Sequence, residues 1–150
     1  MIGASFAVHP DFKSHTGAVM KMGEGALQCV SKKQKLNTRS STEAELVGVD
    51  DVMTQVLWTK LFLESIGYEV ERNILFQDNK SAITLEENGR TSVGKRNRAL
   101  NIRYFFVTDQ VKKGNIEIQY CPSEKMVGDF MTKPVQGQKF REFRKEMLGN

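Results

Sequence analysis

The stretch RNILFQDNKSAI, residues 72–83, joins a short apolar run to the start of a helix through an acidic residue. Ile74, Leu75 and Phe76 have the composition of a buried strand. Asp78 lies at the carboxyl end of this strand, where functional groups gather in open α/β sheets. Asp78 is therefore the first candidate for a functional side chain.

The segments before this strand predict an antiparallel sheet followed by a long helix. Three apolar runs, separated by polar and glycine-containing turns, predict strands at 4–8, 18–22 and 26–31. Apolar residues at helical spacing begin at Leu46, and Gly67 is expected to stop that helix.

The segments after Asp78 predict helices and one further strand. We expect helices over about 80–87 and from the basic run 94–103 to about 113, a strand over 115–121, a helix that starts within 122–135, and a C-terminal helix within 136–150. A meander followed by alternating strands and helices predicts a single α/β domain over residues 1–150. Its sheet would be mixed and five-stranded, with a three-stranded antiparallel meander and two parallel strands, flanked by helices.

The composition is that of an ordinary soluble globular domain. The chain has 150 residues, of which 39% are hydrophobic and 27% charged, and its apolar runs are too short to predict a membrane span or a secretory leader. Cys29 and Cys121 lie far apart in sequence and predict buried free thiols in a reducing compartment. A net charge of +4 allows an anionic partner without indicating one.

Three acidic residues on separate elements are placed to meet at one edge of the sheet. Glu45 lies in the first turn of the long helix, Asp78 ends a strand, and Asp129 begins a helix after the last strand. Carboxylates this close repel one another unless a cation lies among them, so such a cluster typically binds hard divalent metal ions. Two such ions can activate water and stabilise the leaving oxygen in phosphodiester hydrolysis.

Each acidic residue also has a purely structural interpretation. Thr42 and Glu45 have the spacing of a capping box, in which Glu45 would satisfy backbone donors. Asp78, followed by Asn79, could cap the next helix, and Asp129 could be an exposed helical acid. Spacing alone leaves these alternatives open.

Four ordered motifs give the chain a resemblance to a known family. They are ASFAVHPDFKSHTGAVM (4–20), TRSSTEAELVGVDDVMTQVLWTKLFLESIG (38–67), FQDNKSAITLEEN (76–88) and NIRYFFVTDQVKKGNIEIQYCPSEKMVGDFMTKPVQGQKF (101–140). Over roughly residues 2–148 the chain resembles the ribonuclease H domain of the reverse transcriptase of copia-type LTR retrotransposons, part of the Pol polyprotein.

The resemblance implies a ribonuclease H-like fold that hydrolyses the RNA strand of an RNA·DNA hybrid with two Mg²⁺ ions, or with Mn²⁺. It implies that Glu45, Asp78 and Asp129 are the catalytic metal ligands. Glu45 is preferred to Glu43 because the family pattern places the ligand before an aliphatic residue, here Leu46.

The chain departs from the family pattern at two positions. Gly3 stands where family members carry the first catalytic aspartate, and Ala99 stands where a histidine is usual. Glycine offers no side-chain oxygen to replace the ligand that would bridge both metals. We therefore expect impaired cleavage.

A hybrid-binding surface needs basic and hydroxyl groups along a groove, because a hybrid presents two phosphate backbones and the 2′-hydroxyls of the RNA. The candidates for substrate binding are Asn79, Ser81, Lys33, Arg39, Lys95, Arg96, Arg98 and Arg103. For each of the basic side chains, a solvated basic loop is the alternative.

The same resemblance implies the partners and the location. The expected partners are the hybrid and the polymerase domain of the same polyprotein, and no membrane partner is expected. The domain would be monomeric and would act in a cytoplasmic virus-like particle or in the nucleus. Gly3 keeps a second interpretation open, that of a catalytically inactive hybrid-binding or scaffold domain. A phosphoacceptor Asp78 in a receiver-like protein would require a doubly wound parallel sheet, which the opening meander contradicts.

Overall fold

The computed structural model describes residues 1–88 and 98–149, and the side chains of residues 98–100 lie outside this description. The strands are β1 (Ile2–Ser5), β2 (His15–Met22), β3 (Gly25–Lys33), β4 (Ile74–Gln77) and β5 (Glu117–Tyr120). The helices are α1 (Ser41–Ser65), α2 (Lys80–Asn88), α3 (Arg98–Lys112) and α4 (Gly137–Leu148), with two short 3₁₀ helices, η1 (Ser123–Lys125) and η2 (Val127–Met131). The predicted order of strands and helices is confirmed, except that the predicted helix after β5 is replaced by η1 and η2.

The strands form two hydrogen-bonded sheets. β1, β2 and β3 form the predicted antiparallel meander, and β4 pairs with β5 in parallel. β1 packs beside β4, yet no ladder of backbone hydrogen bonds joins them in the part of the chain that the structure describes. A cavity of about 180 Å³ is lined by residues of both sheets, among them Ile2 and Leu75. The hydrogen bonding therefore shows a three-stranded and a two-stranded sheet, and the predicted single five-stranded sheet is not confirmed.

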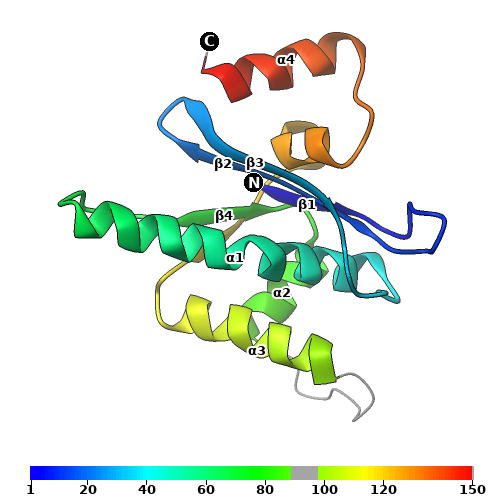
Figure 1. Ribbon diagram of the computed structural model, residues 1–150, viewed down its shortest axis with the longest axis horizontal. Helices are drawn as coiled ribbons and strands as arrows, with labels where there is room; N and C mark the ends of the chain where they lie inside the picture. The colour runs from blue at the N-terminus through cyan, green and yellow to red at the C-terminus, as the bar shows by residue number, and fades with distance from the viewer. Residues whose placement is uncertain (89–97, 150) are drawn as a thin grey trace.

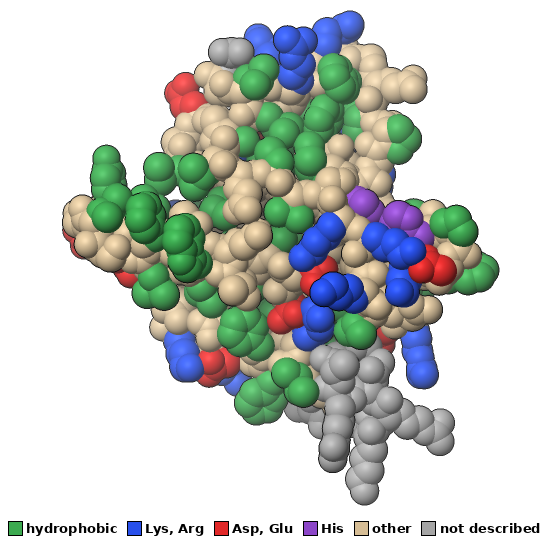
Figure 2. All heavy atoms as spheres, viewed as in Figure 1, with side chains coloured by type: hydrophobic (Ala, Val, Ile, Leu, Met, Phe, Trp, Pro, Cys, Tyr) green, Lys and Arg blue, Asp and Glu red, His purple; other side chains and the backbone are tan. Residues whose placement is uncertain are grey.

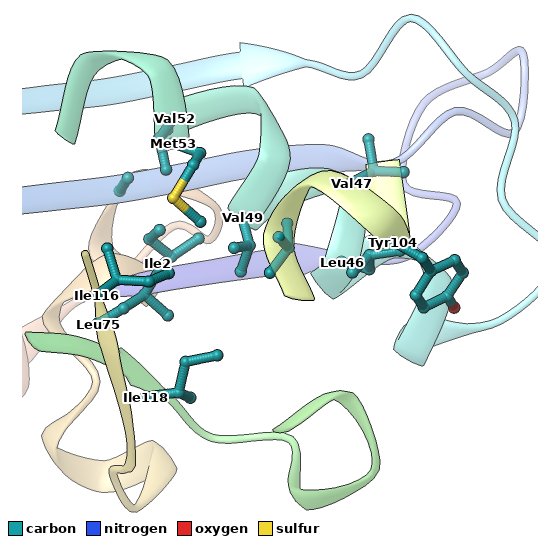
Figure 3. Packing of buried hydrophobic residues seen from close by; sticks show 12 residues of the cluster. Ile2, Leu46, Val47, Val49, Val52, Met53, Leu75, Tyr104, Ile116 and Ile118 are labelled. Atoms are coloured by element: carbon teal, nitrogen blue, oxygen red, sulfur yellow. The ribbon is translucent and has the colours of Figure 1, made fainter. Parts of the chain in front are cut away.

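The helices lie on both sides of these strands (Figure 1). α1 crosses one face with α2 and α3 packed beyond it, whereas η2 and α4 lie on the opposite face. Leu46, Val49 and Met53 of α1 are buried against Ile2 and Leu75, so one apolar core holds the two sheets together (Figure 3). Within the described residues, no helix is both long and apolar enough to span a membrane.

Two predicted segments were wrong in their bounds or type. The first strand spans 2–5 rather than 4–8, because Ala7 has a φ of 52° and cannot continue an extended strand. The segment 122–135 forms short 3₁₀ turns rather than a helix. There Gly128 lies so close to β1 that an added Cβ would be 3.1 Å from the Gly3 amide nitrogen.

The two halves of α1 differ in their surroundings. Residues from Ala44 to Val49 are all buried, whereas Trp58, Leu61 and Phe62 are exposed. Figure 2 shows hydrophobic side chains gathered over the exposed C-terminal end of this helix, at the left. The buried half is the one that carries Glu45.

Both cysteines are free, as predicted, but only one of them is buried. Cys121 is buried and Cys29 is exposed on β3.

Candidate functional site

Glu45 is turned into the protein and takes no part in capping its helix. The N-cap of α1 is Ser40, whose Oγ accepts a hydrogen bond from the Glu43 amide at 3.2 Å. Glu43 Oε2 in turn accepts one from the Arg39 amide at 2.8 Å. The Thr42–Glu45 capping box is therefore wrong, since Ser40 and Glu43 supply the cap two residues earlier. This arrangement leaves Glu45 available for another role.

The Glu45 carboxyl group links α1 to both sheets. It is 6% exposed, and it accepts hydrogen bonds from the Ala4 amide of β1 at 3.0 Å and from Gln77 Nε2 of β4 at 3.4 Å. Its pKa is raised to about 8, mainly by burial and to a lesser extent by the charges of Asp78 and Asp129, against the opposing effect of these two donors. The three carboxyl groups therefore lie within electrostatic reach of one another.

Asp78 lies at the end of β4, as predicted, and its side chain does not cap α2. Asn79 supplies that cap, because its Oδ1 accepts a hydrogen bond from the Ala82 amide at 3.0 Å. Asp78 Oδ2 accepts a hydrogen bond from Ser123 Oγ at 2.7 Å. The capping interpretation of Asp78 is therefore wrong, and its half-buried carboxylate faces η1 instead.

Gln77 is a site residue that the sequence analysis missed. Its side chain is fully buried, and its Oε1 accepts hydrogen bonds from the amides of Asp78 and Asn79 at 2.9 and 3.1 Å. Its Nε2 donates to Glu45, so one side chain connects two of the acidic residues. The available signal was the alternation of β4, which turns position 77 inward together with Leu75. A polar side chain at an inward strand position requires polar partners.

Asp129 of η2 lies against Gly3 of β1. It is 6% exposed within η2, so the exposed helical acid is a wrong interpretation. A Cβ added to Gly3 would be 3.0 Å from Asp129 Oδ1, which means that a side chain at position 3 would point into the cluster. Lys133 Nζ lies 2.8 Å from Asp129 Oδ2. The structure thus brings together Glu45, Asp78, Asp129 and the backbone of Gly3.

The donor set suits a hard cation, but the side chains are not arranged around one. Carboxylate oxygens are the ligands that Mg²⁺ prefers in proteins. Within residues 1–88 and 98–149, no group of three His, Cys, Asp or Glu side chains is placed to hold a metal ion as it stands. Ser123 and Lys133 each take one carboxylate oxygen. The three carboxylates would therefore have to rearrange before they could share an ion.

Two of the expected substrate-binding residues form ion pairs with acidic side chains. Lys33 pairs with Asp11 at 2.6 Å, and Arg103 pairs with Asp50 and Asp51. Figure 2 shows basic and acidic side chains intermixed on this face.

The remaining expected substrate-binding residues lie just before α1, at the start of α2, at the start of α3 and outside the described residues. Arg39 and Ser81 are exposed, and Asn79 is the cap of α2. Lys95 and Arg96 lie outside the described residues, and so does the side chain of Arg98.

The fold and the site define an α/β domain with an acidic cluster where its two sheets meet. No family model matches the chain. It is similar to the retrovirus-related Pol polyprotein from transposon TNT 1-94 of Nicotiana tabacum, with 29% identity over 137 residues, 91% of this chain and 10% of that protein. The corresponding protein from transposon RE1 of Arabidopsis thaliana is 29% identical over 134 residues, 89% of this chain and 9% of that protein. The transposon Ty1-NL2 Gag-Pol polyprotein of Saccharomyces cerevisiae is 25% identical over 139 residues, 92% of this chain and 8% of that protein.

The chain thus spans about a tenth of the length of the curated relatives it matches. The comparisons support a Pol-derived domain of the retrotransposon type.

Proposed function

We propose that this chain is a ribonuclease H-like nuclease domain of a retrotransposon Pol polyprotein, which hydrolyses the RNA strand of RNA·DNA hybrids. The observation that supports this most is the meeting of Glu45, Asp78 and Asp129 beside Gly3, in a chain similar to Pol polyproteins over nine tenths of its length. Its partners would be the hybrid and the polymerase domain of the same polyprotein. The monomeric domain would act in a cytoplasmic virus-like particle or in the nucleus.

In this proposal the three carboxylates hold two Mg²⁺ ions, or Mn²⁺. When bound, such ions activate water for attack on the phosphodiester and stabilise the departing oxygen. The chain itself holds the ligands in place: the Ala4 amide and Gln77 orient Glu45, and Gln77 fixes the backbone at Asp78. The exposed side chains of Arg39 and Ser81 would contact phosphate or the RNA strand.

Gly3 limits this activity. An aspartate at this position would place a fourth carboxylate in the cluster, and the present chain lacks it. The contact of 3.0 Å from an added Cβ to Asp129 Oδ1 involves the end of a side chain, so a shift of Asp129 by a few tenths of an ångström would accommodate it. We therefore expect slow cleavage by this chain and faster cleavage once the carboxylate is introduced.

The test is cleavage of a labelled RNA·DNA hybrid in Mg²⁺ and in Mn²⁺ by this chain, Gly3→Asp and Gly3→Asn. We expect cleavage to rise at least about tenfold in Gly3→Asp, because the added carboxylate would supply the missing metal ligand. Gly3→Asn has the same size without the charge and should give no such rise. Asp78→Asn added to Gly3→Asp should abolish the gain. A folded Gly3→Asp that cleaves no better than Gly3→Asn would contradict the nuclease proposal.

A second candidate function is a catalytically inactive domain that binds the hybrid or supports the polymerase. The observation in its favour is that Lys133 pairs with Asp129 and that Ser123 donates to Asp78. Position 3, which would supply a further aspartate, is a glycine. This candidate predicts hybrid binding without cleavage in every variant. Its affinity should fall steeply as salt rises, because phosphate contacts release counterions. An affinity that does not change with salt would exclude phosphate contacts.

A further inference from the structure

Lys133 contacts the acidic cluster, and the nuclease proposal gives it no role. Its ammonium group lies 2.8 Å from Asp129 Oδ2. The backbone keeps the two residues together, since the amides of Thr132 and Lys133 both donate to the Asp129 carbonyl at 3.0 Å. Ser5 Oγ also donates to the Thr132 carbonyl at 3.4 Å, which ties this segment to β1. Hydrogen bonds within this segment and to β1 therefore hold Asp129 and Lys133 next to each other.

The two partners differ in how easily they can move. The Asp129 side chain is 9% exposed, whereas that of Lys133 is 52% exposed. A lysine has a long flexible stem, so its ammonium group can leave for solvent while Asp129 stays in place. Asp129 Oδ1 is turned towards Gly3, and Oδ2 is the oxygen that Lys133 takes. A divalent ion that uses Asp129 must share these two oxygens with Lys133 or displace it.

The missing side chain at position 3 makes this competition matter more. With an aspartate there, Asp129 would be one of four carboxylates, and here it is one of three. Each remaining oxygen therefore contributes a larger share of the metal affinity. An ammonium group beside one of them also repels a divalent cation directly.

We propose that Lys133 is a positioning residue that competes with divalent metal for Asp129 and holds this buried carboxylate in the absence of metal. This inference rests on the proposed function, because it takes the cluster to be the metal site. Its consequence is opposite to that of losing a ligand: removal of the Lys133 charge tightens metal binding.

The test is a titration of the full chain with Mn²⁺ in the absence of nucleic acid. The electron paramagnetic resonance signal of the unbound ion measures how much Mn²⁺ is bound. Lys133→Met keeps the length of the side chain and removes its charge. We expect it to bind Mn²⁺ about fivefold more tightly, the upper value for a partly exposed ion pair. Lys133→Arg keeps the charge and should restore the affinity of the unchanged protein. Lys112→Met, at an exposed position at the end of α3, controls for net charge and should have little effect.

Thermal melts give a second readout that does not depend on activity. Lys133→Met leaves Asp129 without its ammonium partner, so without metal this variant should melt at a lower temperature than the unchanged protein. Addition of Mn²⁺ should raise the melting temperature of the variant more than that of the unchanged protein. Equal Mn²⁺ affinity in Lys133→Met and the unchanged protein, with loss of binding in Asp129→Asn, would overturn this inference and leave the proposed metal site intact. Absence of Mn²⁺ binding in all the folded variants would overturn both.

Discussion

Two glutamates of this domain are both buried and have very different surroundings. Burial raises the pKa of Glu45 and that of Glu86 to about 8. Glu45 accepts hydrogen bonds from Ala4 and Gln77, and two further acids lie within electrostatic reach. Both oxygens of Glu86 lack a hydrogen-bond partner among the described residues. A perturbed pKa thus marks burial at both places, and only the converging donors and carboxylates mark Glu45 as part of a candidate site.

The largest expected effect is on stability and comes from Glu86. Its pKa is about 8 in the folded protein and 4.5 in the unfolded chain, so the folded state binds more protons between these values. Its contribution to the free energy of unfolding is therefore greatest below pH 4.5 and is lost as the pH rises through 8. Glu86→Gln mimics the protonated acid. The free energy of unfolding of Glu86→Gln, minus that of the unchanged protein, should therefore be higher at pH 7 than at pH 4 by on the order of 3 kcal/mol.

This prediction is checked by urea unfolding of both proteins from pH 4 to pH 8. Glu87→Gln is the matched control, because Glu87 is the exposed neighbour on the same helix and raises the Glu86 pKa less than burial does. A difference between Glu86→Gln and the unchanged protein that stays constant across this pH range would show that Glu86 is not buried as a neutral acid.

The next effect breaks the polar surroundings that distinguish Glu45. Gln77→Leu keeps a buried side chain of similar size but leaves the amides of Asp78 and Asn79 without their acceptor. We expect a loss of about 2 kcal/mol in the free energy of unfolding, the cost of buried donors without partners. Gln119→Leu on the neighbouring strand β5 is the control, because Gln119 is only half-buried and donates to the exposed Glu117. Similar losses in the two variants, measured by urea unfolding, would argue against a special role of Gln77.

The comparison also shows what the sequence could and could not predict. The order of strands and helices followed from apolar spacing, and Asp78 was placed correctly because a strand, a carboxylate and a helix follow one another directly. The convergence on Gly3 depends on β1 and η2, which are far apart in the chain. The close approach of Gly128 to β1 that allows it is a tertiary packing effect without a local pattern.

Residues whose roles depend on partners elsewhere in the fold were the least predictable. Thr42 and Glu45 had the spacing of a capping box, but Glu45 instead accepts hydrogen bonds from Ala4 and Gln77 on other elements. Lys33 is a candidate for phosphate contact, and its ion pair with Asp11 was not expected from the sequence. Spacing along one helix or loop carries no information about such long-range partners. Glu86 gave no sequence signal of burial either, since it lies in an ordinary polar helix.

Addition of metal should separate the two glutamates directly. If Glu45 is a ligand, Mg²⁺ at about ten times its dissociation constant should stabilise the unchanged protein by about 1.4 kcal/mol. Glu86→Gln should show the same gain, and Glu45→Gln should show little or none, because an amide replaces one charged ligand. Melting curves with and without Mg²⁺ give the result. A full gain in Glu45→Gln would place the ion elsewhere.

The smallest effect concerns α2, the helix that begins just after Asp78 and carries Glu86 near its end. Asn79 caps this helix through the Ala82 amide, so Asn79→Ala should cost about 1 kcal/mol of stability. Asn79→Ser keeps an N-cap acceptor and should recover most of that loss. Because the cap uses Asn79 and leaves the three carboxylates unchanged, Mn²⁺ affinity should be the same in all three proteins. A drop in Mn²⁺ affinity that follows the loss of the cap would mean that α2 itself holds Asp78 in place, and the site and the cap would then be one unit.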